Sequence, residues 1–276
     1  MLDIDLGVTT NFAPRRWPSV KQWIEIIHGK LEMELCELSL DLLDPFTREP
    51  TKTAMIQEIV ESCDDYEVQI YSTHTGNSVK NSNLFFHPDL GMRLNTIEWF
   101  ENAIDITAGI DAVATGGYIG TMTEDFNRNQ KKSHYLLDFA EDCLVYLSNL
   151  SYEAGLNCFL WELLPSLLNQ FKIEQIIAVL DNINSISKAP TKIALNISDQ
   201  SDLKTMAELS DYLGLIHIDN ADNIGRILNI FSNIDSKNQV KHVPIMVNYL
   251  PNKKTDSEEI LRDLKNIIAQ LKSNIK

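Results

Sequence analysis

Polar side chains that can bind a metal ion or move a proton stand at the ends of short apolar runs in this chain. They are Glu162, Asn196, His217 and Asn248, which supply one carboxylate, one imidazole and two amides. An oxygen-rich site with a single imidazole suits a hard divalent cation such as Mg2+ or Mn2+. Such an ion would polarise a substrate carbonyl, and Glu162 beside it could act as general base at the neighbouring carbon. The four residues therefore predict proton transfer next to a carbonyl.

The small negative charge of the expected ligands limits how tightly they could hold a metal ion. Glu162 alone supplies one negative charge, and amide oxygens bind cations more weakly than carboxylates do. A tightly held ion would therefore also need a carboxylate from Asp199 or Asp219, which follow two of the apolar runs.

The elements that must position these residues are short apolar runs alternating with longer amphipathic stretches. Most of the runs have the length of buried strands, and the stretches between them have helical spacing. The expected strands are Leu2–Val8, Met33–Leu40, Glu67–Ser72, Ile110–Ala114, Asn157–Trp161, Lys192–Ile197, Leu213–Ile218 and Val243–Tyr249. The expected helices cover residues 20–27, Thr51–Cys63, Pro88–Thr107, Lys131–Ala154, Leu167–Ile183, Asp202–Tyr212, Asn223–Asn233 and Asp256–Asn274. Eight strand-helix units in 276 residues predict one (β/α)8 barrel over residues 1–276. A doubly wound open sheet is the alternative, but no GxGxxG follows the first run.

In such a barrel the chemistry lies where strands end and loops begin, so the polar residues at other strand ends are further candidates. We expect substrate contacts from Trp17, His74, Asn77, Gly117 and Asn248. Several candidates also have a structural explanation. Thr, Gly and Asn near His74 favour turns, the Gly116-Gly117 pair suits a tight turn, and Trp17 follows two arginines in what would be a solvated basic loop. His217 stands in an apolar run, where a histidine is often a hydrogen-bonded core residue.

Composition narrows the class of protein. Asp and Glu total 39 against 24 Lys and Arg, a net charge of −15 that repels phosphate backbones and anionic membranes. No apolar run reaches the length of a spanning helix, and the four cysteines form no CxxC pair. The first residues, MLDIDLGVTT, carry acids where a secretory signal would carry bases. We expect a cytoplasmic protein that acts on a small molecule and binds neither nucleic acid nor membrane.

Several stretches of the first 165 residues resemble one family. TTNFAPRRWPSVKQWIEII and ELSLDLLDPF resemble the opening of the tetrose-phosphate (erythrulose phosphate) epimerases, of the xylose-isomerase-like sugar phosphate isomerase/epimerase superfamily. The similarity continues through STHTGNSVKNSNLFFHPDLGMR, TGGYIGTM and LWELLP.

The resemblance implies a (β/α)8 barrel, a sugar or sugar-phosphate substrate, a Mn2+ or Mg2+ ion, and a homodimer or homotetramer. It places Glu162 on the family's first metal-ligand glutamate and His217 on the strand-seven histidine ligand. Asn196 stands where the family has a ligand aspartate, and the run ending Asn248-Tyr249 stands where it has a second glutamate. Two of four implied ligands have thus lost their charge, which leaves Glu162, Asn196 and His217 as the expected metal site.

Three hypotheses follow. The first is an isomerase or epimerase with Glu162 as base and His217 as second ligand or electrophilic partner. A second keeps the barrel but assigns the amides to direct substrate binding in a metal-independent isomerase, lyase or hydrolase. The third is an inactive barrel that acts as a binding or partner subunit.

Overall fold

Eight parallel strands close into one barrel in the computed structural model, which describes residues 5–197, 200–222, 224–230, 243–252 and 254–275. The strands are β1 (Leu6–Thr9), β2 (Leu35–Ser39), β3 (Gln69–His74), β4 (Ala114–Gly117), β5 (Cys158–Leu163), β6 (Thr191–Ile197), β7 (Leu213–Ile218) and β8 (Ile245–Val247). Each strand pairs with its sequence neighbours, and β1 pairs with β8 to complete the ring. The predicted (β/α)8 fold is confirmed.

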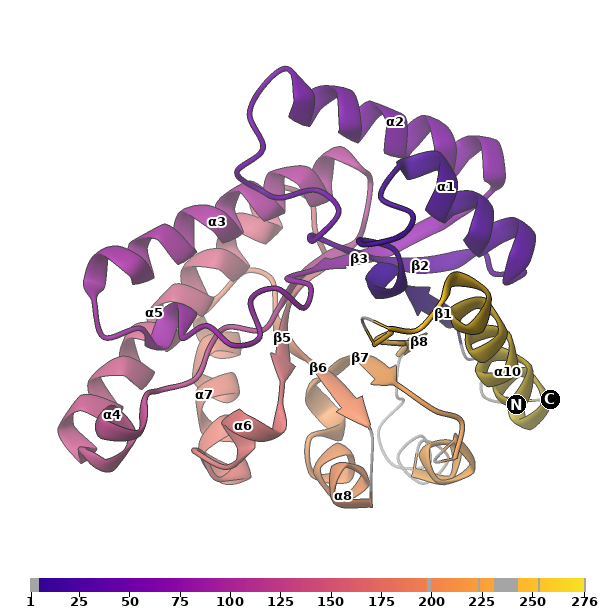
Figure 1. Cartoon of the computed structure of the whole chain (residues 1–276). Helices are drawn as coiled ribbons and strands as arrows, with labels where there is room; N and C mark the ends of the chain where they lie inside the picture. The colour runs from indigo at the N-terminus through magenta and orange to yellow at the C-terminus, as the bar shows by residue number, and fades with distance from the viewer. Residues whose placement is uncertain (1–4, 198–199, 223, 231–242, 253, 276) are drawn as a thin grey trace.

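Helices surround the barrel on its outside (Figure 1). They are α1 (Val20–Glu25), α2 (Thr51–Tyr66), α3 (Leu90–Gly109), α4 (Glu124–Arg128), α5 (Gln130–Glu153), α6 (Pro165–Leu168), α7 (Ile173–Ile186), α8 (Gln200–Glu208) and α10 (Ser257–Ile275), with residues 224–230 also helical. Part of the expected first strand (residues 2–4) and part of the expected helix 223–233 lie outside the described residues. None of the described helices is long and apolar enough to cross a membrane.

Two expected elements differ from the structure. The fourth strand was expected at Ile110–Ala114 but begins at Ala114, because α3 extends to Gly109 and Asp111 turns the chain with a positive φ of 58°. The expected helix Leu167–Ile183 is divided into α6 and α7, since the chain leaves the helix after Leu168 and starts again at Ile173. Neither difference moves a candidate site residue away from its strand end.

Two apolar layers hold the barrel together. Small and aliphatic side chains, among them Ala114, Leu160 and Met246, fill its interior below the strand ends. A larger layer, which includes Trp23 and Phe100, packs the helices onto the outside of the strands.

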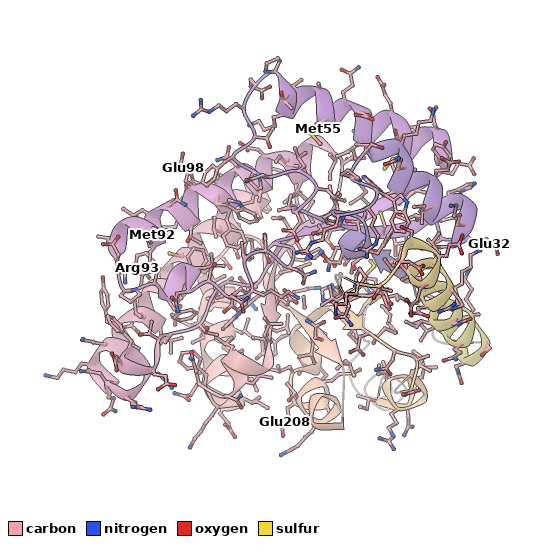
Figure 2. The ribbon with its side chains drawn as sticks, viewed as in Figure 1. Glu32, Met55, Met92, Arg93, Glu98 and Glu208 are labelled. Atoms are coloured by element: carbon pink, nitrogen blue, oxygen red, sulfur yellow. The ribbon has the colours of Figure 1, made fainter. Side chains whose placement is uncertain are left out.

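Exposed carboxylates such as Glu98 and Glu208 extend from the outer helices, away from both layers (Figure 2). A filled interior leaves only the strand ends and their loops to build a site.

Candidate functional site

The Glu162 carboxylate lies at the end of β5 with 1% of the residue exposed. One of its oxygens, Oε1, accepts hydrogen bonds from Lys80 Nζ at 3.0 Å and from Asn196 Nδ2 at 2.7 Å. The other, Oε2, is buried and accepts no hydrogen bond from any described residue. Burial alone would raise the pKa of Glu162, but the Lys80 ammonium and the nearby imidazoles outweigh it and lower that pKa. The carboxylate is therefore charged at neutral pH and has one oxygen available to a ligand.

A second buried carboxylate, Glu37, approaches the same region from β2. Its Oε2 is 2.5 Å from His217 Nε2, and its Oε1 accepts a hydrogen bond from Ser72 at 3.0 Å. Burial opposes the charge of this group, but His217 and His74 outweigh burial and lower the pKa of Glu37 to about 2. An ionised Glu37 accepts the bond, so His217 Nε2 carries the proton. His217 Nδ1 has no partner among the described residues.

His74 completes the group at the end of β3. Its Nδ1 accepts the backbone N–H of Gly76 at 3.1 Å, which places the ring proton on Nε2. Nε2 lies 3.9 Å from Glu37 Oε2, too far for a hydrogen bond, and has no closer partner in the described chain. Burial lowers the pKa of His74, so the ring is a neutral donor aimed into the site. It can bind a substrate oxygen.

A chain of hydrogen-bonded amide side chains links the strand ends next to Glu162. Thr9 Oγ1 and Asn11 Nδ2 donate to Asn248 Oδ1 at 3.1 and 2.8 Å. Asn248 Nδ2 then donates to Asn196 Oδ1 at 3.3 Å, and Asn196 donates to Glu162. The chain fixes the orientation of each amide and points the Asn196 NH2 group at the carboxylate.

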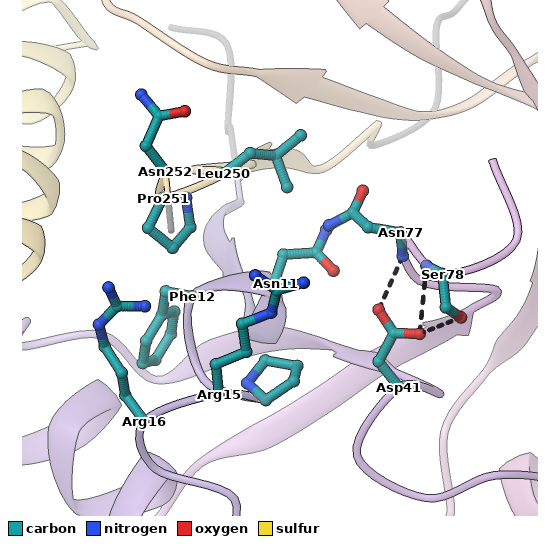
Figure 3. Close-up of a pocket in the computed structure, with 11 residues that line it drawn as sticks. Asn11, Phe12, Arg15, Arg16, Asp41, Asn77, Ser78, Leu250, Pro251 and Asn252 are labelled. Atoms are coloured by element: carbon teal, nitrogen blue, oxygen red, sulfur yellow. Dashed lines mark hydrogen bonds between the residues drawn. The ribbon is translucent and has the colours of Figure 1, made fainter. Parts of the chain in front are cut away.

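A hollow of about 600 Å3 opens at the same end of the barrel, beside Asn11 (Figure 3). Its lining includes Arg15, Arg16 and Asn77, and Asn77 Oδ1 has no described partner. Glu162 does not line this hollow, but Asn11 connects the two through the amide chain. The hollow thus offers room and positive charge next to the buried polar group.

The loop after β3 forms one wall of the hollow and carries Lys80. Asp41 holds it by accepting the backbone N–H of Asn77 at 2.8 Å and the Ser78 hydroxyl at 2.5 Å (Figure 3). Gly76 has a φ of +73°, and a Cβ there would lie 2.5 Å from Asp41 Cγ. The close approach of Asp41 therefore requires glycine at this turn.

The other predicted residues have more structural surroundings. Trp17 packs edge-on against Phe12, with ring centroids 5.9 Å apart, and does not line the hollow. Gly117 has a φ of +125°, and a Cβ there would lie 2.5 Å from Thr75 Oγ1, so local packing explains this glycine. Substrate contact by either residue stays a prediction.

The donor set does not fit a divalent cation. Glu162, Asn196 and His217 lie in one region, but the carboxylate faces the Lys80 ammonium and the Asn196 N–H, and the Asn196 oxygen already accepts from Asn248. Of the expected ligand atoms, Glu162 Oε2 and His217 Nδ1 have no partner among the described residues, which leaves one charged oxygen and one nitrogen for an ion. Ammonium and amide hydrogens repel a cation. Within the described ranges, no three His, Cys, Asp or Glu side chains are grouped to hold a metal.

A tightly held ion was expected to need Asp199 or Asp219 as well. Asp219 is exposed and accepts a hydrogen bond from Asn220, and Asp199 lies outside the described residues.

Glu37 and Lys80 are site residues that were not predicted from the sequence. A signal for Glu37 exists, because a charged residue inside the apolar run LCELS is the same pattern that identified Glu162. Lys80 has no such signal, since it stands in a polar loop where lysine is ordinary.

Comparisons with known proteins agree with the fold. No family model matches the chain. The chain is 23% identical over 160 residues to a D-erythrulose 1-phosphate 3-epimerase from Brucella abortus, a match that covers 58% of this chain and 51% of that protein. The chain thus matches about half the length of this curated relative.

Solved structures extend the similarity to nearly the whole chain. A protein assigned as a xylose isomerase from Rhodospirillum rubrum superposes with a TM-score of 0.86 at 18% identity, covering 98% of this chain and 99% of that one. D-psicose 3-epimerase from Clostridium cellulolyticum gives 0.74 at 14% identity, covering 99% and 100%. A xylose isomerase-like barrel from Mycobacterium smegmatis, solved with magnesium, gives 0.64 at 12% identity, covering 99% and 98%. The resemblance to xylose-isomerase-like barrels is confirmed for the fold.

Proposed function

We propose that this chain is a sugar or sugar-phosphate isomerase or epimerase of the xylose-isomerase-like superfamily, which moves a proton at the carbon next to a carbonyl. The observation that carries the proposal is the buried, charged Glu162 with its unpartnered Oε2 at the strand ends. A desolvated carboxylate with one oxygen already held is costly unless it serves a ligand. The epimerase names of the relative and of one structural neighbour support the same chemistry.

In the proposed reaction Glu162 Oε2 removes the proton from the carbon next to the carbonyl. The electron pair of the C–H bond forms a carbon–carbon double bond, and the carbonyl oxygen becomes an oxyanion. His74 Nε2–H is placed to donate to a substrate oxygen. No step passes through a metal ion, because the donor set does not fit one.

Epimerisation needs a second group that gives a different proton to the opposite face of the same carbon, because the proton removed first is held by Glu162. Glu37 and His217 lie on β2 and β7, and β5 is separated from each in the closed barrel. The pair therefore approaches a bound sugar from a different direction than Glu162 does. A proton given to the same carbon from that side completes epimerisation, and Glu162 then releases the proton it took to solvent. In isomerisation a proton goes to the former carbonyl carbon, the hydroxyl proton of the first carbon moves to the oxyanion, and the carbonyl forms on the first carbon.

Arg15 and Arg16 are placed to bind a polar or phosphorylated group at the end of the sugar away from the reacting carbon. Guanidinium groups bind phosphate well, and both arginines line the hollow. A cytoplasmic location and a homo-oligomeric state stay predictions.

The test is solvent exchange in a panel of ketoses and ketose phosphates in D2O, followed by 1H NMR. We expect exchange at the carbon next to the carbonyl for at least one sugar, and Glu162→Gln to slow it by about 1,000-fold. Glu153→Gln is the matched control, because Glu153 is also paired with a lysine but is exposed. Unchanged exchange in folded Glu162→Gln protein would refute the assignment.

A further inference from the structure

Lys80 is paired with a fully buried carboxylate, whereas the carboxylate partners of the other paired lysines of the described chain, Lys52, Lys188 and Lys204, are 39–60% exposed. Its Nζ lies 3.0 Å from Glu162 Oε1, and only 19% of its side chain is exposed against 1% for Glu162. The Lys188–Glu153 pair has nearly the same distance, 2.9 Å, but both side chains are more than half exposed. Removing an ammonium from water is expensive, so the position of Lys80 needs an explanation beyond surface pairing.

The loop delivers Lys80 to this position in a fixed way. Asp41 anchors the turn before it, as described above, and the Lys80 backbone N–H donates to Asn77 O at 3.4 Å. The ammonium has three N–H donors, and Glu162 is its hydrogen-bond partner in the described chain. Donors remain for a substrate oxygen placed beside the same carboxylate.

Charge balance favours an ammonium over a divalent ion here. Asn196 and Asn248 are neutral, so Glu162 contributes one negative charge to its immediate hydrogen-bonded group. A single ammonium neutralises that charge and holds Oε1. Oε2 is left as the available base, next to a fixed positive charge.

We infer that the Lys80 ammonium is the electrophilic group of this site, holding the substrate carbonyl oxygen and stabilising the oxyanion formed when Glu162 Oε2 takes the neighbouring proton. This inference rests on the proposed function. The C–H bond breaks, its proton goes to Glu162, and its electron pair ends on the oxygen bound by Lys80. The ammonium keeps its protons throughout, and when the proton returns to carbon the carbonyl forms again. No metal and no redox partner is required.

The activity test uses the full chain after chelation and desalting. Lys80→Ala should slow solvent exchange into the sugar by about 100-fold, the usual effect of losing one oxyanion donor. Added ethylammonium should restore at least about a tenth of the wild-type rate, since it returns an ammonium to the vacated space. Lys188→Ala is the control, because it removes an equally close but exposed lysine. Undiminished exchange in Lys80→Ala, or rescue by Mn2+ instead of the amine, would overturn the inference.

A second measurement does not depend on the folding of Lys80→Ala. Mn2+ titrated into wild-type protein and followed by electron paramagnetic resonance should give the spectrum of the free ion at one equivalent. Stoichiometric binding that Glu162→Gln abolishes would overturn the inference.

Failure of the inference is distinguishable from failure of the proposed function. Wild-type exchange that needs added Mn2+ would refute the role of Lys80 alone, whereas no exchange with or without metal would refute both.

Discussion

Replacing Lys80 by methionine should reverse the sign of the contribution that Glu162 makes to the pH dependence of the free energy of unfolding. The substitution removes the ammonium but keeps most of the aliphatic stem, so the buried Glu162 carboxylate loses its main counter-charge. Breaking a buried pair in this way costs about 3–5 kcal/mol. Because Lys80 retains 19% exposure, we expect the lower end of that range, about 3 kcal/mol at pH 7.

The sign follows from proton linkage. In the wild type the folded-state pKa of Glu162 is lowered, so its contribution to stability is present above its ordinary pKa and is lost as the pH falls below it. Without Lys80, burial dominates and the folded-state pKa lies above the ordinary value. Acid then relieves the unpaired charge, and the stability gap to wild type should shrink by about 2 kcal/mol between pH 7 and pH 5.

The assay is urea unfolding followed by circular dichroism at both pH values. The set contains wild type, Lys80→Met, Glu162→Gln and the double variant. Glu162→Gln should cost little, because the partly exposed ammonium can turn to water, and the double variant should recover at least about 2 kcal/mol relative to additivity. The buried ion pair would be refuted if the unfolding free energies of wild type and Lys80→Met differed by less than about 0.5 kcal/mol at pH 7. It would also be refuted if that difference were larger at pH 5 than at pH 7.

Three further predictions concern groups around Glu162. Glu37→Gln should lower kcat for exchange by about 100-fold with little change in KM, because His217 loses the carboxylate that holds its proton on Nε2. Arg15→Ala should raise KM for a phosphorylated sugar by about tenfold and leave the KM for the free sugar unchanged. His74→Gln should lose less stability than wild type between pH 7 and pH 5, by at most about 2 kcal/mol. The reason is that burial lowers the pKa of His74, so the neutral wild-type ring must take up a proton when the protein unfolds at pH 5. Urea unfolding at the two pH values measures this difference.

Controls separate these effects from general damage. Ser72→Ala removes only the second hydrogen bond of Glu37 and should affect kcat much less than Glu37→Gln. Arg128→Ala removes an exposed arginine paired with Glu124, away from the hollow, and should leave both KM values unchanged. Equal loss in Ser72→Ala, or equal KM shifts for both sugars in Arg15→Ala, would contradict the assigned roles. A His74→Gln protein as acid-sensitive as wild type would contradict a neutral buried His74.

The barrel was predictable because the signals are local and repeated. Short apolar runs with polar residues at their ends fix both the strands and the edge at which side chains meet. The exception is β4, where β-branched and apolar residues at 110–113 appear strand-like but the backbone turns at Asp111. The strand is built on glycines because a Cβ at Gly116 would lie 1.8 Å from Leu160 O and a Cβ at Gly117 would lie 2.5 Å from Thr75 Oγ1.

The site was predictable only in part, because the partners of each group come from distant loops. Glu162 could be identified as a charge after an apolar run. Its partner Lys80 lies 82 positions earlier in a polar loop, and nothing local marks it. The metal hypothesis treated Asn196 as an oxygen donor, whereas the amide chain through Asn248 turns its NH2 group toward the carboxylate.

Deuterium incorporation by chelated wild-type protein, with metal content measured on the same sample, tests metal-free proton transfer at this site. We expect one solvent deuteron to enter the carbon next to the carbonyl of a ketose or ketose phosphate, with less than about a tenth of an equivalent of metal bound. Failure to label any sugar of the panel would contradict the proton-transfer function. Labelling that appears only when Mn2+ or Mg2+ is restored would contradict the role given to Lys80.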